Sequence, residues 1–301
     1  MGVEFKGALF VSGGRTDFGT GFSDEVWRST DTGATWDLVS SKTIPSRAYH
    51  VHLVVGNCQI IMGGHTFFTF YNDVWQSCDN KGAEWTRITE HAEWAPRSGL
   101  AATVTHDNSI ILAGGCYNKN GNPAARSFWG DVFKSTDGGL TFKLQTEAPG
   151  WVARSGPRLI ETADNKLLIV AGEVGFTGDT QLVDIWASGD DGASWELVTD
   201  APGFSARSGH GVVKSPTGSI LVIAGWPHLH DLWESTDRGA SFEKIRDDVW
   251  GCEGEENNSD CGKFDFWPIS TSRNELITIG GSGAYSTFGK LWQDTWVAKF
   301  A

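Results

Sequence analysis

The residue types best suited to chemistry follow six pairs of small residues that recur along the chain. Each pair closes a short apolar run, and the residue directly after it differs from one copy to the next. A residue that varies between repeats does not solve a packing problem that all repeats share, so this set is the first candidate for a functional site. Histidine, cysteine and glutamate can bind transition metals, and a Glu–His pair can carry acid–base chemistry. The six residues are Arg15, His65, Cys116, Glu173, Trp226 and Ser282.

Loops close to these positions carry further polar and aromatic side chains. For each residue taken alone, the alternative is a solvated loop side chain. The candidate catalytic residues are Glu173, His65 and Tyr285, and the candidate metal ligands are His65, Cys116, Glu173 and His228. A divalent metal is the cofactor that such ligands would hold, and the sequence identifies no other. The remaining loop residues of interest are Asp17, Tyr71, Tyr117, Asp179 and His230.

The small pairs mark a repeat with a period of about 50 to 57 residues, a length typical of propeller blades. A strand-like apolar run precedes each pair, and an acidic–apolar–aromatic triplet follows the variable loop after it. The pairs are Gly13-Gly14, Gly63-Gly64, Gly114-Gly115, Ala171-Gly172, Ala224-Gly225 and Gly280-Gly281. The triplets begin at Glu25, Asp73, Asp131, Asp184, Asp231 and Asp294.

Five of the copies continue into a tight turn with the pattern Ser-x-Asp-x-Gly-x-x-aromatic. The aspartate can accept backbone N–H bonds in such a turn, and glycine supplies a positive φ. We therefore expect a structural role for Asp31, Asp79, Asp137, Asp190 and Asp237. The turns run from Ser29 to Trp36, Ser77 to Trp85 (with one extra residue), Ser135 to Phe142, Ser188 to Trp195 and Ser235 to Phe242.

The Gly pair with its trailing aromatic resembles the kelch repeat, and the aspartate turn resembles the Asp-box of sialidase-like propellers. Together these two patterns cover nearly the whole chain. They predict an all-β fold, a single six-bladed β-propeller over residues 1–301 with four-stranded antiparallel blades and a polar inserted loop at 247–263. We expect this domain to be a monomer.

The repeat is incomplete at both ends of the chain. Too few residues precede Gly13 for an inner strand, so the first blade is expected to lack one. The last blade is expected to lack its fourth strand, since only Phe300 and Ala301 follow its third. A propeller normally hides such a seam by pairing terminal strands within one blade. The segment from Gly2 to Lys6 is a candidate for that shared strand.

A ring of basic residues is predicted at the starts of the inner strands: Arg47, Arg97, Arg154, Arg207 and Lys263. Two interpretations are open. The ring could bind an anionic ligand through bidentate hydrogen bonds, or each residue could pair with the acidic start of a third strand on the same face. The second interpretation is favoured, because a residue that is repeated in every blade usually meets a need of every blade.

Composition and charge restrict the partners. A net charge of −13 and a pI near 5.0 argue against nucleic acid and anionic membranes, and no apolar run is long enough for a membrane helix. Five cysteines show no C-x-x-C spacing, which disfavours structural zinc. Cys252 and Cys261 bracket a polar loop with a glycosylation pattern at Asn257, which favours a secreted protein with a local disulfide.

These features favour a small polar ligand or glycan that is bound at the mouth of the central channel, with catalysis on it as an option. The residues after the small pairs and Arg47, Arg97, Arg154 and Arg207 are its candidate contacts. The resemblance also implies enzymes among its possibilities, because kelch-like propellers include a copper-radical oxidase, iron-assisted specifier proteins and a sugar mutarotase. A glycosidase would use the four arginines with Tyr285 as nucleophile. A protein-interaction scaffold is the third alternative, supported by the aromatic run from Phe67 to Tyr71.

Overall fold

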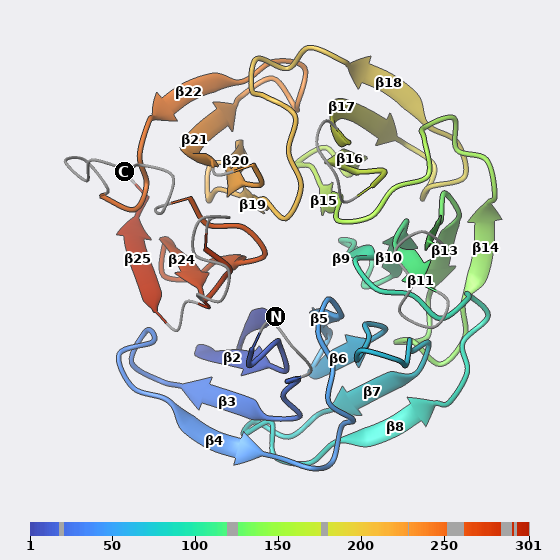
Figure 1. Ribbon diagram of the computed structural model, residues 1–301, viewed down its shortest axis with the longest axis vertical. Coiled ribbons are helices and arrows are strands. Elements are labelled where there is room, and N and C mark those ends of the chain that lie inside the picture. The colour runs from blue at the N-terminus through green and yellow to red at the C-terminus, as the bar shows by residue number, and fades with distance from the viewer. Residues whose placement is uncertain are drawn as a thin grey trace.

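The chain folds as a ring of six antiparallel sheets around a central axis (Figure 1). The computed structural model describes residues 1–17, 21–118, 126–175, 180–227, 229–251, 262–283, 291 and 294–300. Each inner strand contacts the inner strand of the next sheet, and the last contacts the first, so the ring is closed. The predicted six-bladed propeller is confirmed. Within the described ranges no helix is long and apolar enough to cross a membrane.

Each blade runs outward from the axis in sequence order. The inner strands are β1 (Gly2–Phe5), β5 (Val51–Val55), β9 (Ala101–Val104), β15 (Arg158–Glu161), β19 (Gly211–Lys214) and β23 (Trp267–Ser270). The second strands are β2 (Ala8–Ser12), β6 (Cys58–Met62), β10 (Ile110–Ala113), β16 (Leu167–Glu173), β20 (Ile220–Gly225) and β24 (Glu275–Ile279). The third strands are β3 (Val26–Ser29), β7 (Val74–Ser77), β13 (Val132–Ser135), β17 (Gln181–Ser188), β21 (Leu229–Ser235) and β25 (Thr295–Lys299).

Fourth strands lie on the outer rim of the first five blades: β4 (Asp37–Ser40), β8 (Thr86–Thr89), β14 (Lys143–Thr146), β18 (Glu196–Thr199) and β22 (Glu243–Arg246). A separate hairpin of β11 (Cys116–Asn118) and β12 (Arg126–Phe128) rises from the third blade. The second strands carry the core. Ile60, Ile110 and Val170 are fully buried, because each second strand has a strand on both sides and a neighbouring blade against each face. This explains why their apolar runs are continuous rather than alternating.

The structure corrects the predicted seam at the first blade. β1 pairs with β2 from Gly2 opposite Val11 to Phe5 opposite Ala8, so this segment is the inner strand of the first blade rather than a strand shared with the last. The first blade is therefore complete. Its inner strand was missed because no basic residue marks its start, as one does in the other five blades. In the last blade the described residues form three strands, β23, β24 and β25.

One buried ion pair is repeated inside four of the blades. In the fourth blade the Arg154 guanidinium donates to both carboxylate oxygens of Asp184, at 2.6 and 2.8 Å, and to the carbonyl of Ala171 at 3.0 Å. The Trp186 indole N–H donates to the same carboxylate at 2.7 Å. The same bidentate pair joins Arg47 to Asp73, Arg97 to Asp131 and Arg207 to Asp231. One side chain thus fixes the start of the inner strand, the small pair and the third strand to one another.

The same arginines also link adjacent blades through their backbone. The N–H of the second residue of a small pair donates to the carbonyl of the basic residue in the next blade; Gly64 donates to Arg97 at 2.9 Å and Gly115 to Arg154 at 2.8 Å. Glycine is needed here, because Gly64 has a φ of 91° and an added Cβ would lie 2.8 Å from the carbonyl oxygen of Ala48. The small pairs are therefore contact points between neighbouring blades.

The aspartate turns hold themselves together through side-chain hydrogen bonds. In the third blade Asp137 accepts from the Ser135 hydroxyl, the Thr141 hydroxyl and the Thr141 N–H, while Gly139 N–H donates to Ser135 Oγ. Equivalent bonds surround Asp31, Asp190 and Asp237. These carboxylates are thus occupied within their own turns.

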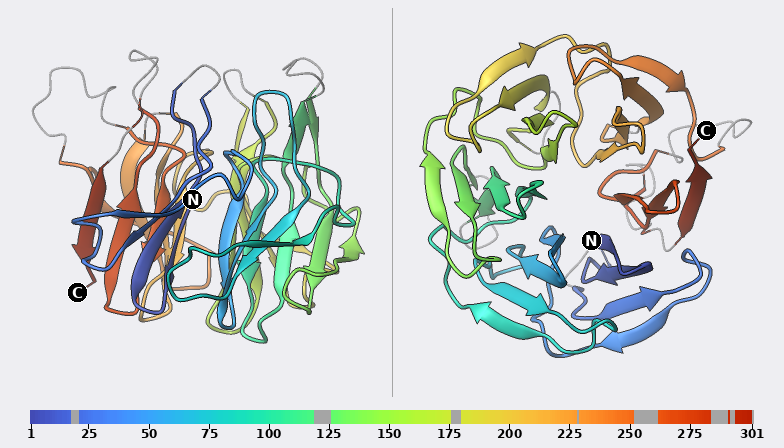
Figure 2. Two further views of the ribbon diagram at one scale, coloured as in Figure 1. Left: turned by 90° about the horizontal axis from the view of Figure 1, so that it is seen from below. Right: turned by 180° about the vertical axis from the view of Figure 1, so that it is seen from behind.

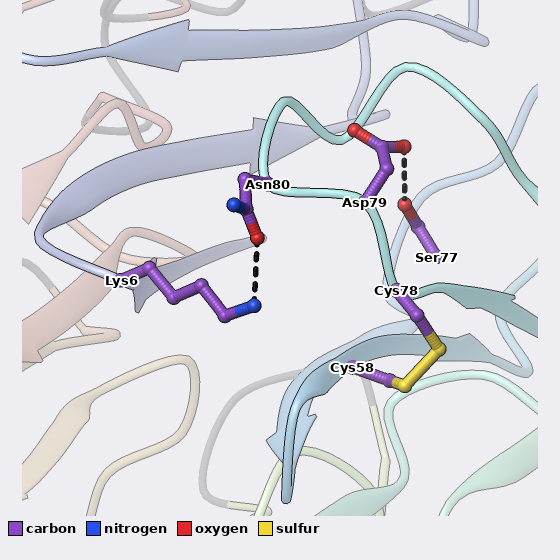
Figure 3. The surroundings of a disulfide bond; sticks show 6 residues. All are labelled: Lys6, Cys58, Ser77, Cys78, Asp79 and Asn80. Atoms are coloured by element: carbon purple, nitrogen blue, oxygen red, sulfur yellow. Dashed lines mark hydrogen bonds between the residues drawn. A yellow bond between two sulfur atoms is a disulfide. The ribbon is translucent and has the colours of Figure 1, made fainter.

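A disulfide bond joins Cys58 to Cys78 in the second blade, at the edge where β6 and β7 lie side by side (Figure 3). This bond was not predicted, because the two cysteines are distant in sequence and show no motif. The predicted pair Cys252 and Cys261, and the glycosylation site at Asn257, lie outside the described residues. A disulfide is consistent with an extracellular location, since such bonds persist in oxidising compartments.

Removal of one partner of the buried pair should weaken the fold strongly. We expect Arg154→Ala to lower the free energy of unfolding by about 3–5 kcal/mol, because it leaves the largely buried Asp184 carboxylate without its cation. The matched control is Arg87→Ala. It breaks the exposed pair with Glu90 and should lower the same quantity by about 0–1 kcal/mol. Urea denaturation measures both, and equal losses would contradict the structural role assigned to the buried pair.

Candidate functional site

Two sets of residues meet at one end of the propeller axis. In an antiparallel blade, the end of the second strand lies beside the start of the inner strand, and isolated bridges show this directly: Glu173 pairs with Ser155 and Trp226 with Ser208. The aspartate turns, which follow the third strands, lie at the opposite end. We call the first end the axial mouth. Figure 2 shows the ring from the side and from behind.

The residues after the small pairs reach this mouth and contact the next blade. The Glu173 carboxylate accepts from Ser208 Oγ at 3.1 Å, and Cys116 Sγ lies 3.4 Å from Ser155 Oγ. Trp226 packs edge-on against Phe264 with ring centres 5.3 Å apart. The variable residues therefore have local contacts, and they form a set of interblade neighbours around the mouth rather than one cluster.

Three residues that the sequence analysis did not single out converge on the axis itself. The Tyr49 hydroxyl, from the second blade, donates to Asp265 Oδ2 of the sixth blade at 3.2 Å. Arg158 reaches over from β15 of the fourth blade. Its Nε donates to the carbonyl of His210 at 2.6 Å, and its guanidinium lies 4.8 Å from the ring centre of Trp267 on β23. We call Tyr49, Arg158 and Asp265 the axial cluster.

Tyr49 and Asp265 occupy equivalent and strained positions. Both stand two residues after the basic residue of their blade, and their φ angles are 55° and 56°. The equivalent residues of the third, fourth and fifth blades are Gly99, Gly156 and Gly209, also with positive φ. A left-handed backbone costs a residue with a side chain about 1–2 kcal/mol relative to glycine. Two blades thus carry a functional type of side chain where the fold itself favours glycine.

Burial shifts the titration of all three residues toward their neutral forms. It raises the pKa of Asp265, and Arg158, Tyr49 and Arg15 oppose that shift only in part. It lowers the pKa of Arg158 to about 10 despite the nearby Asp265 charge, and it raises the pKa of Tyr49 together with that charge. The Asp265 side chain is exposed to water in the central channel, although protein atoms surround it on all sides. This is expected for a side chain that lines the axis.

The part of the mouth near the second blade is aromatic. The His65 ring stacks on Phe70, with centres 5.0 Å apart and planes at 22°, and also contacts Tyr49. Phe70 in turn contacts Tyr117 from β11 at 4.9 Å. The guanidinium of Arg15 lies 5.5 Å from the ring centre of Phe22, which also contacts His65. The mouth therefore combines flat apolar faces with charged groups.

The predicted ring of basic residues has a different role from ligand binding. Arg47, Arg97, Arg154 and Arg207 are fully buried, and each pairs with the aspartate of its own third strand. Lys263 contacts Asp294 in the same way at 2.5 Å. This corrects the prediction that the four arginines contact a ligand, because their donors are already bound to carboxylate and carbonyl oxygens. The interpretation as pairs that hold strands together is the one that the geometry supports.

The described residues hold no group of three or more histidine, cysteine, aspartate or glutamate side chains that is suited to a metal ion. Among the predicted ligands, Cys116 is buried against two serines and Glu173 faces Ser208. Neither is brought together with His65 in such a group. The described residues thus do not fit the predicted divalent metal. His228, Asp179 and the candidate nucleophile Tyr285 lie outside the described residues.

A signal for the axial cluster was present in the sequence. Aligned on the basic residue, three blades read Arg-Ser-Gly, whereas the second reads Arg47-Ala-Tyr49 and the sixth Lys263-Phe-Asp265. Loss of a repeated glycine marks a position where a side chain has been introduced at an energetic cost. Arg158 carries no comparable signal, since the inner strands differ freely at that position.

Comparison with known proteins supports the fold. The solved structure titled "Structure of YjhT" is similar over 99% of this chain and 93% of its own, with a TM-score of 0.74 and 15% sequence identity. At this identity the likeness shows the six-bladed propeller fold and nothing finer. No protein-family model matches the chain, and no curated protein matches it.

The shifted pKa of Asp265 predicts a dependence of stability on pH. Because the folded state raises this pKa, the group stabilises the fold below its unfolded pKa of about 4, and this contribution is lost as pH rises through the folded pKa. Asparagine does not titrate. We therefore expect the stability of the native chain relative to Asp265→Asn to fall from about pH 4 to neutral pH, as measured by urea denaturation at each pH.

The matched control for this measurement is Asp137→Asn in an aspartate turn. Burial acts to raise the pKa of Asp137, but the hydrogen bonds of the turn outweigh it and lower the pKa. The native chain should therefore gain stability relative to this variant as pH rises through the folded pKa toward the unfolded value of about 4, and keep that gain at higher pH. Parallel trends for the two substitutions would contradict the environment assigned to Asp265.

Proposed function

We propose that this protein binds a small, polar, negatively charged ligand at the axial mouth. The observation that carries the proposal is the state of Arg158. Its Nε donates to a backbone carbonyl, but within the described ranges its two terminal nitrogens donate to no residue, and the side chain is only half-buried. The four arginines of the blades, by contrast, are bidentate to aspartates. A guanidinium whose two terminal nitrogens are available as donors is well suited to bind a carboxylate, sulfate or phosphate.

The surrounding charges and rings support the same class of ligand. Arg15 and Arg158 both interact with Asp265, so two guanidiniums face one carboxylate at the axis of a chain whose net charge is −13. The rings of His65, Phe70 and Tyr117 supply flat faces of the kind that pack against sugars and other ligands with an apolar side. An acidic sugar combines both properties and is the ligand class that we favour.

Catalysis on the bound ligand is a second candidate function, and the pair of Tyr49 and Asp265 favours it. A carboxyl group whose pKa is raised by burial is better matched to proton transfer near neutral pH than an ordinary aspartate. Among the candidates from the sequence, Glu173 is held by Ser208 and His65 by aromatic neighbours. We therefore assign the acid–base role to Asp265, with Tyr49 as its hydrogen-bond donor.

Two finer assignments also belong to the proposal. The Gly pairs and aspartate turns support kelch-like repeats with Asp-box turns, and the disulfide between Cys58 and Cys78 supports a secreted protein. A protein-interaction role draws support from the loop of the second blade, where Phe68 is 74% exposed beside Phe67. Loss of partner capture in Phe68→Ser, with ligand binding intact, would identify that role separately.

A thermal-shift experiment with matched pairs of neutral sugars and their uronic acids tests the ligand class. Binding to the folded state raises its stability, by about 2.7 kcal/mol at a ligand concentration 100-fold above Kd. We expect a uronic acid to raise the Tm of the native chain and its neutral counterpart to have little effect. Arg158→Leu should abolish the rise, because it removes the free guanidinium.

The control is Arg238→Leu, which removes an exposed arginine at the opposite end of the propeller and should keep the full rise in Tm. Two results would count against the proposal: no member of the panel shifts the native Tm, or Arg158→Leu responds as the native chain does. A neutral sugar that is bound as well as its acid would retain the site and discard the charge requirement.

A further inference from the structure

The outer edge of the sixth blade differs from the edges of the other five. In each complete blade an antiparallel fourth strand pairs with the third strand. In the sixth blade, β25 pairs with β24 along its whole length from Thr295 to Lys299, and no described residue forms a strand on its other side. Figure 1 shows β25 on the rim, where the other blades place their fourth strands.

The side chains along this edge are more exposed than their counterparts. Trp296 is 42% exposed and Val297 47% exposed. Ala298 is exposed too, whereas the serine at the equivalent position of each complete blade is buried and anchors the aspartate turn. The edge therefore combines apolar side chains with backbone groups that no other described strand pairs, a combination that natural sheets usually block with charges or by covering the edge.

The sequence of β25 is complementary to itself in an antiparallel arrangement. When two copies pair with Val297 opposite Val297, the bulky Trp296 faces the small Ala298, and Thr295 faces Lys299. No like charges stand opposite each other, because Lys299 is the one charged residue of the strand. The fourth strands are less suited to such pairing, since β18, β22 and β4 present glutamate, lysine, arginine or aspartate at their rims.

We propose that β25 pairs antiparallel with β25 of a second copy of this chain, centred on Val297. The blade then continues across a two-fold axis as β24–β25–β25–β24, and each copy supplies the other with the outer neighbour that the complete blades already contain. A strand pair of this length forms a small interface, and two chains of net charge −13 repel each other. The dimer is therefore weak, and added salt strengthens it by screening the repulsion.

Sedimentation equilibrium of the native chain at about 0.15 M and about 0.5 M salt tests the pairing first. We expect a monomer–dimer equilibrium that shifts toward dimer at the higher salt. Val297→Lys and Val297→Glu should each abolish it, because each places like charges directly opposite at the centre of the strand pair. An equimolar mixture of the two variants should restore dimers, since opposite charges then face each other. Restoration also shows that both variants are folded.

A cross-linking variant fixes the register independently. Residues that are directly opposite in an antiparallel pair have Cα atoms about 4.5–5.5 Å apart, which lies within the range of about 4.4–6.8 Å that a disulfide bridges. Val297→Cys should form a covalent dimer under mild oxidation, whereas Leu144→Cys, on the outer strand of a complete blade and also exposed, should remain mainly monomeric. This variant introduces no charge, so the cross-linking test remains informative even if the charged variants are destabilised.

Three results would overturn the proposal. The native chain remains a monomer at about 1 mM in both salts, which leaves the edge to another protein or to no partner. The native chain dimerises but both charged variants dimerise equally well, which places the interface elsewhere. Val297→Cys forms no more covalent dimer than Leu144→Cys, which excludes the register.

Discussion

The fold depends on one buried interaction, the bidentate pair between an arginine at the start of an inner strand and an aspartate at the start of a third strand. The guanidinium also binds the carbonyl of the small pair, and the arginine carbonyl accepts from the small pair of the preceding blade. A single residue therefore fixes strands within a blade and blades within the ring. Such a charge is tolerable in the core because every atom of the carboxylate and most donors of the guanidinium are paired.

This arrangement separates the charges that hold the fold from those that are available for function. Arg154 and Arg158 are four residues apart. Both terminal nitrogens of Arg154 donate to the Asp184 carboxylate. Arg158 extends toward the axis, and its two terminal nitrogens donate to no described residue. The distinction lies in repetition. Arg154 has a counterpart in every blade after the first, whereas Arg158 has none. The repeated strands of a propeller thus form a rigid scaffold, and a few side chains that are not repeated can extend from it to the axis.

The architecture could be predicted from the sequence because the repeat is periodic and each copy carries its own turn and aromatic signals. The partners of the basic ring followed from the same periodicity, since a shared residue implies a shared need. The axial cluster could not be predicted in this way. Tyr49 and Asp265 are 216 positions apart, and their contact depends on closure of the ring, which no local pattern encodes. The only local sign of this cluster in the sequence was that Tyr49 and Asp265 replace a glycine that three other blades share. The inner strand of the first blade was missed for a different reason, because it lacks the basic residue that precedes the other inner strands.

The completeness of the first blade has a consequence for how the ring is held shut. Residues 2–40 form all four strands of that blade, so the described parts of the first and last blades exchange no strand. They meet instead through side chains: Leu9 and Trp36 pack against Ile277, and the Glu4 carboxylate accepts from the N–H and hydroxyl of Ser272 at 2.6 Å. The closure of this molecule is therefore an intramolecular docking of one blade against the other through side chains. The ring is therefore closed by side-chain contacts and not by a shared sheet. The two blades can separate at this interface without breaking the hydrogen bonds of any described sheet.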